Sequence, residues 1–302
     1  MRTVVTGASG FVGGWLTRHL LDEGDTVETF PEDLDVSDAP GVLAHLRATA
    51  PEVVYHLAAL THVGRSWEEP EATFSVNAIG TLHVLEAARS LEAPPRVVLV
   101  SSAEVYGSDA GRPNAPRAAI REDDPLRPTS PYAASKVAAE FLGLQAHLGR
   151  GLDVVRVRPF NHVGPGQGDA FVVSALARRI ALAERSGKGE VAVGNLSAAR
   201  DFTDVRDVVR AYRMVAVAGV SGEVYNVCSG VAVPIAQLAC RLVEAARTPI
   251  ELVEDPSLFR PVDVPVLLGD ASRLEELTGW RPRIALETTL GEVLEDWRTR
   301  LG

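Results

Sequence analysis

The chain opens with a strand pattern that runs through a glycine-rich turn into a helical pattern, and this order limits the possible folds more than any other feature. Residues 2–5 are rich in β-branched side chains, glycines follow at positions 7, 10 and 13, and residues 11–22 have helical periodicity. Glycine there permits a tight turn, close approach of the backbone to a pyrophosphate and close helix–strand packing. The helix start then offers free N–H groups to the phosphates. The alternative is an ordinary strand–helix turn. The expected dinucleotide contacts are Gly7, Gly10, Phe11, Val12 and Gly13.

Short β-branched runs continue to alternate with longer helical patterns along the first half of the chain. Strand–helix alternation with nearly continuous apolar strands is typical of a parallel sheet that is covered on both faces. We therefore predict an α/β fold with a doubly wound, Rossmann-type parallel sheet. The strand candidates are residues 2–5, 26–30, 53–56, 96–101 and 152–157, and the helical patterns cover 11–22, 41–50, 73–91 and 131–148.

The pattern loosens after about residue 160, which indicates a smaller C-terminal substrate lobe interleaved with the sheet. We expect a dinucleotide-binding domain over 1–160 and the lobe over 161–302. Helical patterns in the lobe cover 171–185, 205–217, 235–246 and 286–300, and strand candidates lie at 191–193 and 223–227.

Composition narrows the functional classes. A formal net charge of −10 argues against a nucleic-acid partner, because phosphate backbones require a broad basic face. Two cysteines, Cys228 and Cys240, lack the pairs expected of a zinc site, so we expect no metal, while a disulfide between them stays open.

No apolar run approaches the roughly 18 residues that a membrane span needs. The N-terminus has a strand pattern rather than that of a signal peptide. We therefore expect a cytoplasmic protein with no membrane partner.

Tyr132 and Lys136 stand four residues apart at the start of a predicted helix, which places both side chains on one helix face. A nearby ammonium lowers the pKa of a phenol and makes proton transfer at neutral pH easier. By itself the spacing also fits a surface pair. The run Ser101-Ser102-Ala103-Glu104 follows the strand candidate 96–101, at the strand end where ligands bind in parallel sheets. Ser102 is the expected catalytic hydroxyl, and Ser101 is its rival.

The spacing G-x-x-G-x-x-G, the element S-S-x-x-V-Y-G and Y-x-x-x-K together resemble the extended short-chain dehydrogenase/reductase family, and the resemblance extends along nearly the whole chain. It implies a catalytic triad of Ser102, Tyr132 and Lys136, in which Lys136 also holds the nicotinamide ribose. It implies a role for Glu104 in moving a proton or a leaving hydroxyl in dehydratases. The alternative for Glu104 is a loop carboxylate that orients its neighbours.

The resemblance also implies further cofactor contacts. Asp35 and Val36 resemble an adenine-binding element, and Asn77 resembles a helix asparagine beside the active site, although it could be a buried polar residue without function. The loop below the pyrophosphate comprises Leu57, Ala58 and Ala59. The second strand ends near Pro31, where NAD-binding members carry an acidic residue. NAD(H) and NADP(H) both stay open, with NADPH slightly favoured.

The substrate lobe is similar to that of GDP-4-keto-6-deoxy-D-mannose reductases, which reduce a C4 ketone to give GDP-D-rhamnose. Residues 158–167, Arg-Pro-Phe-Asn-His-Val-Gly-Pro-Gly-Gln, and residues 200–209 carry the similarity. The similarity alone implies a GDP-linked nucleotide sugar as substrate, and arginine forks suit the oxygens of its diphosphate. The alternatives are a dehydratase or an epimerase that recycles its cofactor, or a non-catalytic cofactor sensor. The expected substrate contacts are Asn161, Val172, Arg200, Arg260 and Asp263.

The family resemblance further implies a homodimer, in which the helices over 73–91 and 131–148 form a four-helix bundle with those of a second copy. Val137, Phe141 and Leu144 suit such an interface. They could equally face the core of their own chain.

Overall fold

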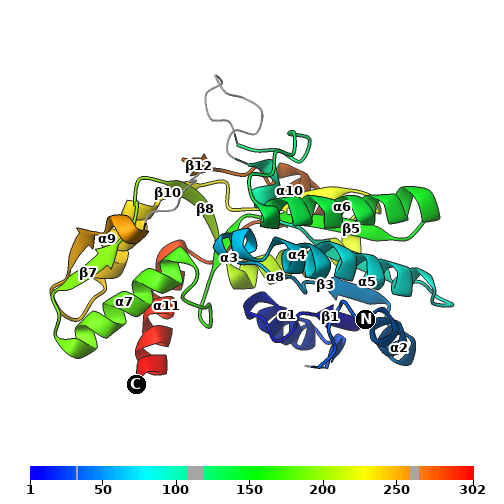
Figure 1. The fold of residues 1–302 in the computed structure, drawn as a ribbon, viewed down its shortest axis with the longest axis horizontal. Coiled ribbons are helices and arrows are strands. Elements are labelled where there is room, and N and C mark those ends of the chain that lie inside the picture. Colours follow the sequence, from blue (N-terminus) through cyan, green and yellow to red (C-terminus); the bar gives the residue numbers. More distant parts are fainter. Residues whose placement is uncertain (32, 108–118, 259–264) are drawn as a thin grey trace.

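The computed structural model describes residues 1–31, 33–107, 119–258 and 265–302, and its largest element is a six-stranded sheet (Figure 1). The strand order is β2-β1-β3-β4-β5-β9, and every neighbouring pair is parallel. This arrangement confirms the predicted α/β class with a doubly wound parallel sheet. The strands are β1 (Arg2–Thr6), β2 (Thr26–Thr29), β3 (Val53–His56), β4 (Arg96–Val100), β5 (Val154–Pro159) and β9 (Val224–Val227).

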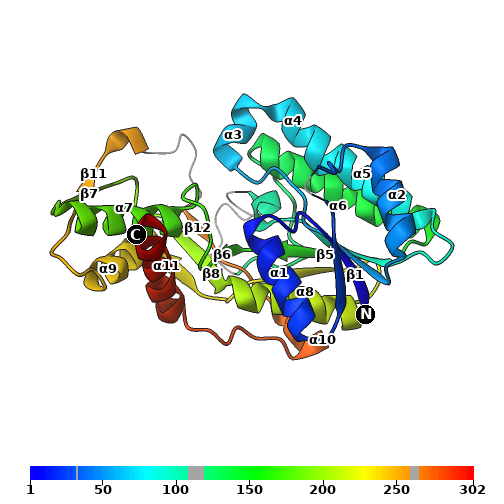
Figure 2. The same cartoon turned by 90° about the horizontal axis from the view of Figure 1, so that it is seen from below.

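Helices cover both faces of the sheet (Figure 2), because successive side chains of a strand point to opposite faces. Val5 packs in one hydrophobic core with α1 and α8, whereas its neighbour Val4 packs in another with α2 and α5. All four residues of β3 are buried, as its continuous apolar run predicts. The covering helices are α1 (Phe11–Asp22), α8 (Val205–Ala218), α2 (Ala39–Thr49), α5 (Gly80–Arg89) and α6 (Pro131–Arg150).

The strand order reverses at β1, which lies between β2 and β3. In open parallel sheets the crevice outside the carboxyl ends of the strands at such a reversal is where ligands bind. The glycine turn follows β1, and residues 57–59 follow β3. The two segments that the sequence nominates for a dinucleotide therefore meet at the same edge of the sheet.

The helix predicted over 73–91 is interrupted. α4 (Pro70–Phe74) leads into a π-helical turn, Ser75–Ile79, and the chain then continues as α5. A further short helix, α3 (Val63–Glu68), precedes α4. Single π turns occur often at functional sites, and this one contains Asn77.

The bounds of α6 follow from its capping residues. The Ser130 side chain accepts a hydrogen bond from the Ala133 N–H at 3.1 Å, and Pro131 occupies the first turn, where its missing N–H costs nothing. Gly151 ends the helix in the left-handed conformation, with φ of 69°. These ends place Tyr132 and Lys136 in the first two turns of the helix.

A smaller lobe with its own hydrophobic core lies at the left of Figure 1. Three helices pack against a two-stranded parallel sheet there. They are α7 (Val172–Ser186), α9 (Ile235–Glu244) and α11 (Leu286–Leu301), and the strands are β7 (Glu190–Val193) and β11 (Glu251–Glu254).

A second small sheet connects the lobe to the large sheet. Its central strand β8 pairs with three short partners, and Asp201 on β8 is fully buried. The Asp201 carboxylate accepts hydrogen bonds from the N–H groups of Ser229, Gly230 and Gly269, at 2.7, 2.9 and 3.2 Å. This carboxylate therefore fixes two loops against one strand. The strands are β8 (Ala199–Asp204), β6 (Asn161–Val163), β10 (Ala232–Pro234) and β12 (Val266–Leu267).

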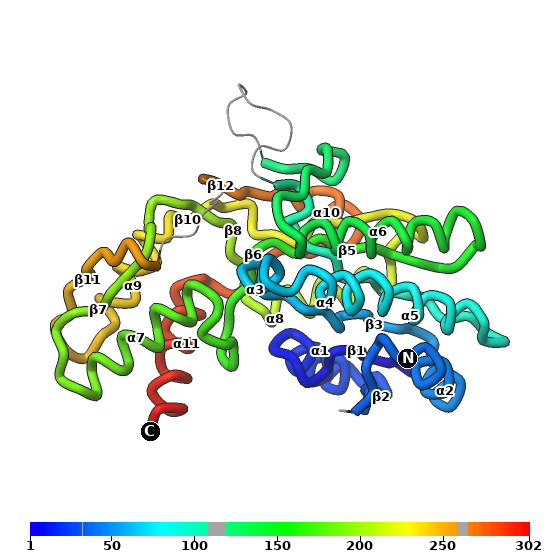
Figure 3. The backbone as a smooth tube through the Cα atoms, viewed as in Figure 1, coloured from blue at the N-terminus to red at the C-terminus, as the bar shows by residue number. Residues whose placement is uncertain are grey.

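The chain passes between the two parts more than once, as the tube in Figure 3 shows. α8, β9 and α10 (Ser272–Thr278) follow residue 160, yet they pack on the large sheet. The expected division at residue 160 stays a prediction.

No helix in the described part of the chain combines the length and the apolar character needed to cross a membrane. Cys228 is a buried free thiol and Cys240 an exposed one, so the disulfide that the sequence left open is not formed.

Candidate active site

The glycine turn lies directly against the loop that follows β3. Gly7 has φ of 70°, and a Cβ atom there would stand 2.8 Å from the Ala58 backbone nitrogen. A Cβ atom on Gly13 would collide with the Gly7 carbonyl oxygen and lie 2.7 Å from the Ala8 Cα. Larger residues therefore cannot replace Gly7 or Gly13 without moving backbone. Gly10 is less confined, since its nearest neighbour would be the Gly7 oxygen at 3.2 Å.

The start of α1 is open to an anion. Gly10 is the N-cap residue, and no side chain in the described part of the chain caps the helix. The first N–H groups of a helix have no partner within it, and the helix dipole adds positive potential there. The close glycine cradle and these N–H groups, which include those of Phe11 and Val12, fit a dinucleotide pyrophosphate.

Asp35 and Val36, the residues predicted to contact the adenine, differ in their surroundings. Val36 is buried, and its carbonyl oxygen lies 3.0 Å from His83 Nδ1. Asp35 is exposed, and its carboxylate accepts from the Ser37 N–H at 2.7 Å. β2 ends at Thr29, and Phe30 and Pro31 follow without a carboxylate. The ordinary acidic signal for the ribose of NAD is missing from these positions.

The structure brings together the predicted triad beyond the carboxyl end of β4. The Ser102 hydroxyl lies near enough to the phenol of Tyr132 to lower the pKa of that phenol. Lys136 lies one turn further along α6 and donates from Nζ to the Val100 carbonyl oxygen at 2.7 Å. Ser101, the rival hydroxyl, is buried and has no hydrogen-bond partner among the described residues. The geometry therefore favours Ser102 over Ser101 as the partner of Tyr132.

Burial dominates the protonation of both helix residues. It raises the pKa of Tyr132 to about 12, against the lowering effect of the nearby Ser102 hydroxyl. It lowers the pKa of Lys136 to about 8, against the raising effect of Glu140. A phenol with a raised pKa stays protonated at neutral pH and can donate a proton. Glu104 is half-buried two residues after Ser102, and its charge also raises the pKa of Tyr132.

Asn77 connects the π turn to α6 and to the loop after β3. Its side-chain amide donates to the Leu60 carbonyl oxygen at 3.0 Å and to Ser135 Oγ at 2.9 Å. Its side-chain oxygen accepts from the Leu60 N–H at 2.7 Å. The amide and the oxygen of the Asn77 side chain therefore both have hydrogen-bond partners, and Asn77 is not an isolated buried amide.

Ser66 was not singled out by the sequence. Its hydroxyl oxygen accepts from the Tyr132 N–H at 3.1 Å and it donates to the Val63 carbonyl oxygen at 2.6 Å. α3 thereby caps the same helix end that carries Tyr132. A single serine 66 residues upstream gives no signal in the sequence, because only the tertiary fold brings it to α6.

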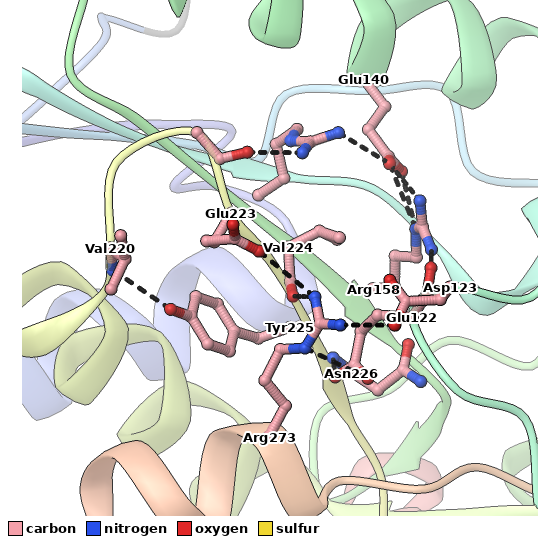
Figure 4. Close-up of polar contacts among 12 residues, drawn as sticks. Glu122, Asp123, Glu140, Arg158, Val220, Glu223, Val224, Tyr225, Asn226 and Arg273 are labelled. Carbon is pink, nitrogen blue, oxygen red and sulfur yellow. Dashed lines mark hydrogen bonds and ion pairs between the residues drawn. The ribbon is translucent and has the colours of Figure 1, made fainter.

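A buried ion pair holds α6 against β5 (Figure 4). The Arg158 guanidinium donates from Nε to Glu140 at 3.0 Å and from another nitrogen to the Tyr106 hydroxyl at 2.7 Å. Tyr106 in turn donates to Asn226 at 2.7 Å. Tyr106 stands four residues after Ser102, and Glu140 one turn after Lys136. The pair therefore aligns the Ser102 segment with the Tyr132 helix.

The predicted substrate residues lie in two groups. Asn161 begins β6, and its side-chain oxygen is buried without a hydrogen-bond partner among the described residues. Arg200 lies on the neighbouring strand β8, is half-buried and donates to the Ala199 carbonyl oxygen at 2.9 Å. Val172 is the half-buried first residue of α7. Arg260 and Asp263 lie outside the described residues.

The loop that begins at Asn161 also contacts the dinucleotide turn. The His162 ring stacks on Phe11, with centroids 6.3 Å apart and planes 12° apart. Trp15 on α1 donates from its indole nitrogen to the Pro165 carbonyl oxygen at 3.0 Å. The expected substrate loop and the expected cofactor turn therefore form one continuous surface.

Comparison with known proteins identifies the family. The model of a family described as GDP-mannose 4,6 dehydratase matches residues 29–293. The GDP-6-deoxy-D-mannose reductase of Pseudomonas aeruginosa is 37% identical, over 99% of this chain and 98% of that protein. The UDP-glucose 4-epimerase of Mycolicibacterium smegmatis is 33% identical over 99% of each chain. The structure of RMD from Pseudomonas aeruginosa complexed with NADPH superposes with a TM-score of 0.89 at 35% identity, over 99% of this chain and all of that chain.

The motifs at the glycine turn, Ser102 and Tyr132 predicted the superfamily, and the matches confirm it over the full length of the chain. The protein belongs to the GDP-mannose 4,6-dehydratase family of the extended short-chain dehydrogenases/reductases.

Proposed function

We propose that the protein is a cytoplasmic reductase that converts the C4 ketone of a GDP-4-keto-6-deoxy-hexose into the alcohol of a GDP-6-deoxy-hexose of the GDP-D-rhamnose type. The observation that carries the proposal is the position of Ser102 near the Tyr132 phenol at the carboxyl edge of the sheet, beside an open glycine turn. The 37% identity to a GDP-6-deoxy-D-mannose reductase supports the substrate class.

The chain's own residues account for the proton transfer. A bound nicotinamide dinucleotide would supply the hydride for the C4 carbon. The Tyr132 phenol, which is protonated at neutral pH, donates its proton to the C4 oxygen. Ser102 donates a hydrogen bond to the same oxygen as negative charge develops on it. The Lys136 ammonium, within the first two turns of the same helix, stabilises the phenolate that remains.

Substrate recognition is assigned to half-buried residues on the paired strands β6 and β8. Asn161 offers to a sugar hydroxyl a buried oxygen that has no partner among the described residues, and Arg200 supplies positive charge for the diphosphate. Val172, Arg260 and Asp263 complete the proposed substrate set on family resemblance alone.

A dehydratase or epimerase is the second candidate, because the Glu104 carboxylate lies near Tyr132. Glu104 follows Ser102 by two residues and acts electrostatically on Tyr132. A base at this position could remove a carbon-bound proton from the sugar. The match to a UDP-glucose 4-epimerase is consistent with such chemistry on this scaffold.

NADP(H) is the proposed cofactor, with NAD(H) as the alternative. The residues that follow β2 present no carboxylate at positions 30 and 31 to repel a 2′-phosphate. The related RMD structure is a complex with NADPH.

Cofactor stoichiometry tests the proposed reaction. With GDP-4-keto-6-deoxy-mannose as substrate, we expect one NADPH to be oxidised for each ketone reduced, and NADH to be used less efficiently. The measurement is loss of absorbance at the reduced-nicotinamide band together with product analysis. Conversion of GDP-mannose to a keto sugar without net oxidation would establish the dehydratase instead. Tyr132→Phe is the matched variant, and it should lose about 100-fold or more in kcat while retaining NADPH affinity.

The pKa of Lys136 predicts an alkaline limit to activity. Burial lowers this pKa to about 8, so the ammonium is lost as the pH rises through that value. If the positive charge is needed, kcat/KM should fall above about pH 8. Lys136→Arg retains its charge to much higher pH and should move the decline upward, whatever its absolute rate. A wild-type profile that stays flat well above pH 8 contradicts this role for the ammonium.

A homodimer through α4, α5 and α6 completes the proposal. Phe141 on α6 is 53% exposed, and Phe74 and Ile79 are exposed on the helices beside it. Val137 packs in a core of its own chain and Leu144 is half-buried, so Phe141 carries most of the free apolar surface.

Phe141→Glu should convert a dimer into a monomer in sedimentation velocity, because it buries a charge in the interface. Leu21→Glu is the matched control, since Leu21 is 55% exposed on α1. Equal sedimentation of both variants and the wild type would contradict the proposed interface.

A further inference from the structure

A buried row of polar side chains, which the proposed mechanism does not use, runs from the glycine turn to the helix of Tyr132. It comprises Thr6, His56, Thr81 and Asn77, and each of them is at most 3% exposed. Thr6 directly precedes Gly7, His56 ends β3, and the other two lie on the π turn and α5. Buried polar groups are costly unless every donor finds an acceptor, so the direction of each hydrogen bond can be worked out.

The lone pairs of Thr6 Oγ1 determine the direction of the hydrogen bond between Thr6 and His56. Thr6 Oγ1 accepts from the N–H groups of Leu57 and Ala58, both at 3.1 Å, which occupies its two lone pairs. Its own proton is then the only group left for His56 Nδ1, 2.8 Å away. His56 Nδ1 is therefore an acceptor, and the proton of the neutral ring resides on Nε2.

The next two links follow in the same direction. His56 Nε2 lies 2.9 Å from Thr81 Oγ1 and donates to it. The Thr81 hydroxyl donates to the Asn77 carbonyl oxygen at 2.6 Å. A protonated imidazolium would turn an N–H toward Thr6, which has no lone pair left. The geometry is thus compatible only with the neutral ring.

The row then reaches the catalytic helix. The Asn77 amide donates to Ser135 Oγ at 2.9 Å, and Ser135 donates to the Tyr132 carbonyl oxygen at 2.8 Å. Ser135 and Tyr132 are both buried in the first two turns of α6. An unbroken set of buried hydrogen bonds therefore joins the cofactor turn to the residue that is assigned the proton transfer.

We propose that His56, held as the neutral Nε2–H tautomer, and Thr81 are positioning residues that make the dinucleotide-binding turn and the Tyr132 helix one rigid unit. The inference rests on the proposed function, because it takes Tyr132 to be the proton donor. Neither His56 nor Thr81 touches the reacting atoms. Their effect is to fix where Tyr132 stands relative to a dinucleotide held at Gly7.

The electrostatics of the site agree with this geometry. Burial, together with the smaller effect of the positive charge of Lys136, lowers the pKa of His56 to about 3. A histidine that stays neutral at every working pH can hold one fixed set of hydrogen bonds. An ordinary histidine would change its donor pattern near pH 6.5.

The first test needs no substrate. In the full-length protein labelled with ¹⁵N-histidine, the ring nitrogens of His56 should show a bare Nδ1 and a protonated Nε2 from about pH 5 to about pH 9. The signals are assigned by their loss in His56→Gln. An Nδ1–H tautomer, or titration of the ring within this range, would overturn the proposal even if the enzyme proves to be an active reductase.

The second test removes one hydroxyl from the row. Thr81→Val should lower kcat about 10- to 100-fold, because Tyr132 loses its fixed position, while NADPH affinity changes much less. Thr81→Ser keeps the hydroxyl and should restore most of kcat. Thr73→Val is the matched control, since Thr73 is equally buried and donates to the Glu69 carbonyl oxygen at 2.8 Å, outside the row.

Two outcomes of the kinetic test are decisive. Near-wild-type kcat in Thr81→Val, or an equal loss in Thr73→Val, would contradict the positioning role. A wild-type protein that reduces no keto sugar would count against the proposed function alone, and the tautomer measurement would then decide the state of His56 by itself.

Discussion

The close approach of two backbone segments at the carboxyl edge of the sheet is the constraint on which the site depends. The turn after β1 lies so near the loop after β3 that a Cβ atom on Gly7 would stand 2.8 Å from the Ala58 nitrogen. Thr6 closes the contact by accepting two N–H groups of that loop. Because both segments leave adjacent parallel strands, the sheet topology itself fixes where a dinucleotide can bind.

Burial then determines the chemistry available beside that turn. Tyr132 and Lys136 sit on a helix that packs on the sheet and is anchored by the Glu140–Arg158 pair. Removal from water favours the neutral form of each group, so it raises the pKa of the phenol and lowers that of the ammonium. The phenol is therefore protonated at neutral pH, and its donation of a proton depends on neighbouring groups that stabilise the phenolate.

The sequence was sufficient for features that depend on neighbouring residues. The helix over 11–22 and the strand over 53–56 have the predicted bounds, because local periodicity determines them. The short strands β6, β8, β10 and β12 were not predicted, since two to six residues paired with distant partners carry no periodic signal. The π turn at Asn77 and the Ser66 cap on α6 likewise depend on tertiary contacts. Motif spacing nevertheless placed Ser102, Tyr132 and the glycine turn at one edge of the sheet.

The NADPH affinity of two neighbouring glycine variants tests most directly whether the packed glycine turn forms the dinucleotide site. Circular dichroism checks that both variants fold. In Gly13→Ala the added methyl group would collide with the Gly7 carbonyl, whereas in Gly14→Ala it would meet only the Ala8 oxygen at 3.8 Å. We expect Gly13→Ala to raise the Kd for NADPH about tenfold or more, roughly 1.4 kcal/mol, and Gly14→Ala to leave it unchanged. Equal affinity in the two folded variants would contradict the claim that the packed glycine turn forms the dinucleotide site.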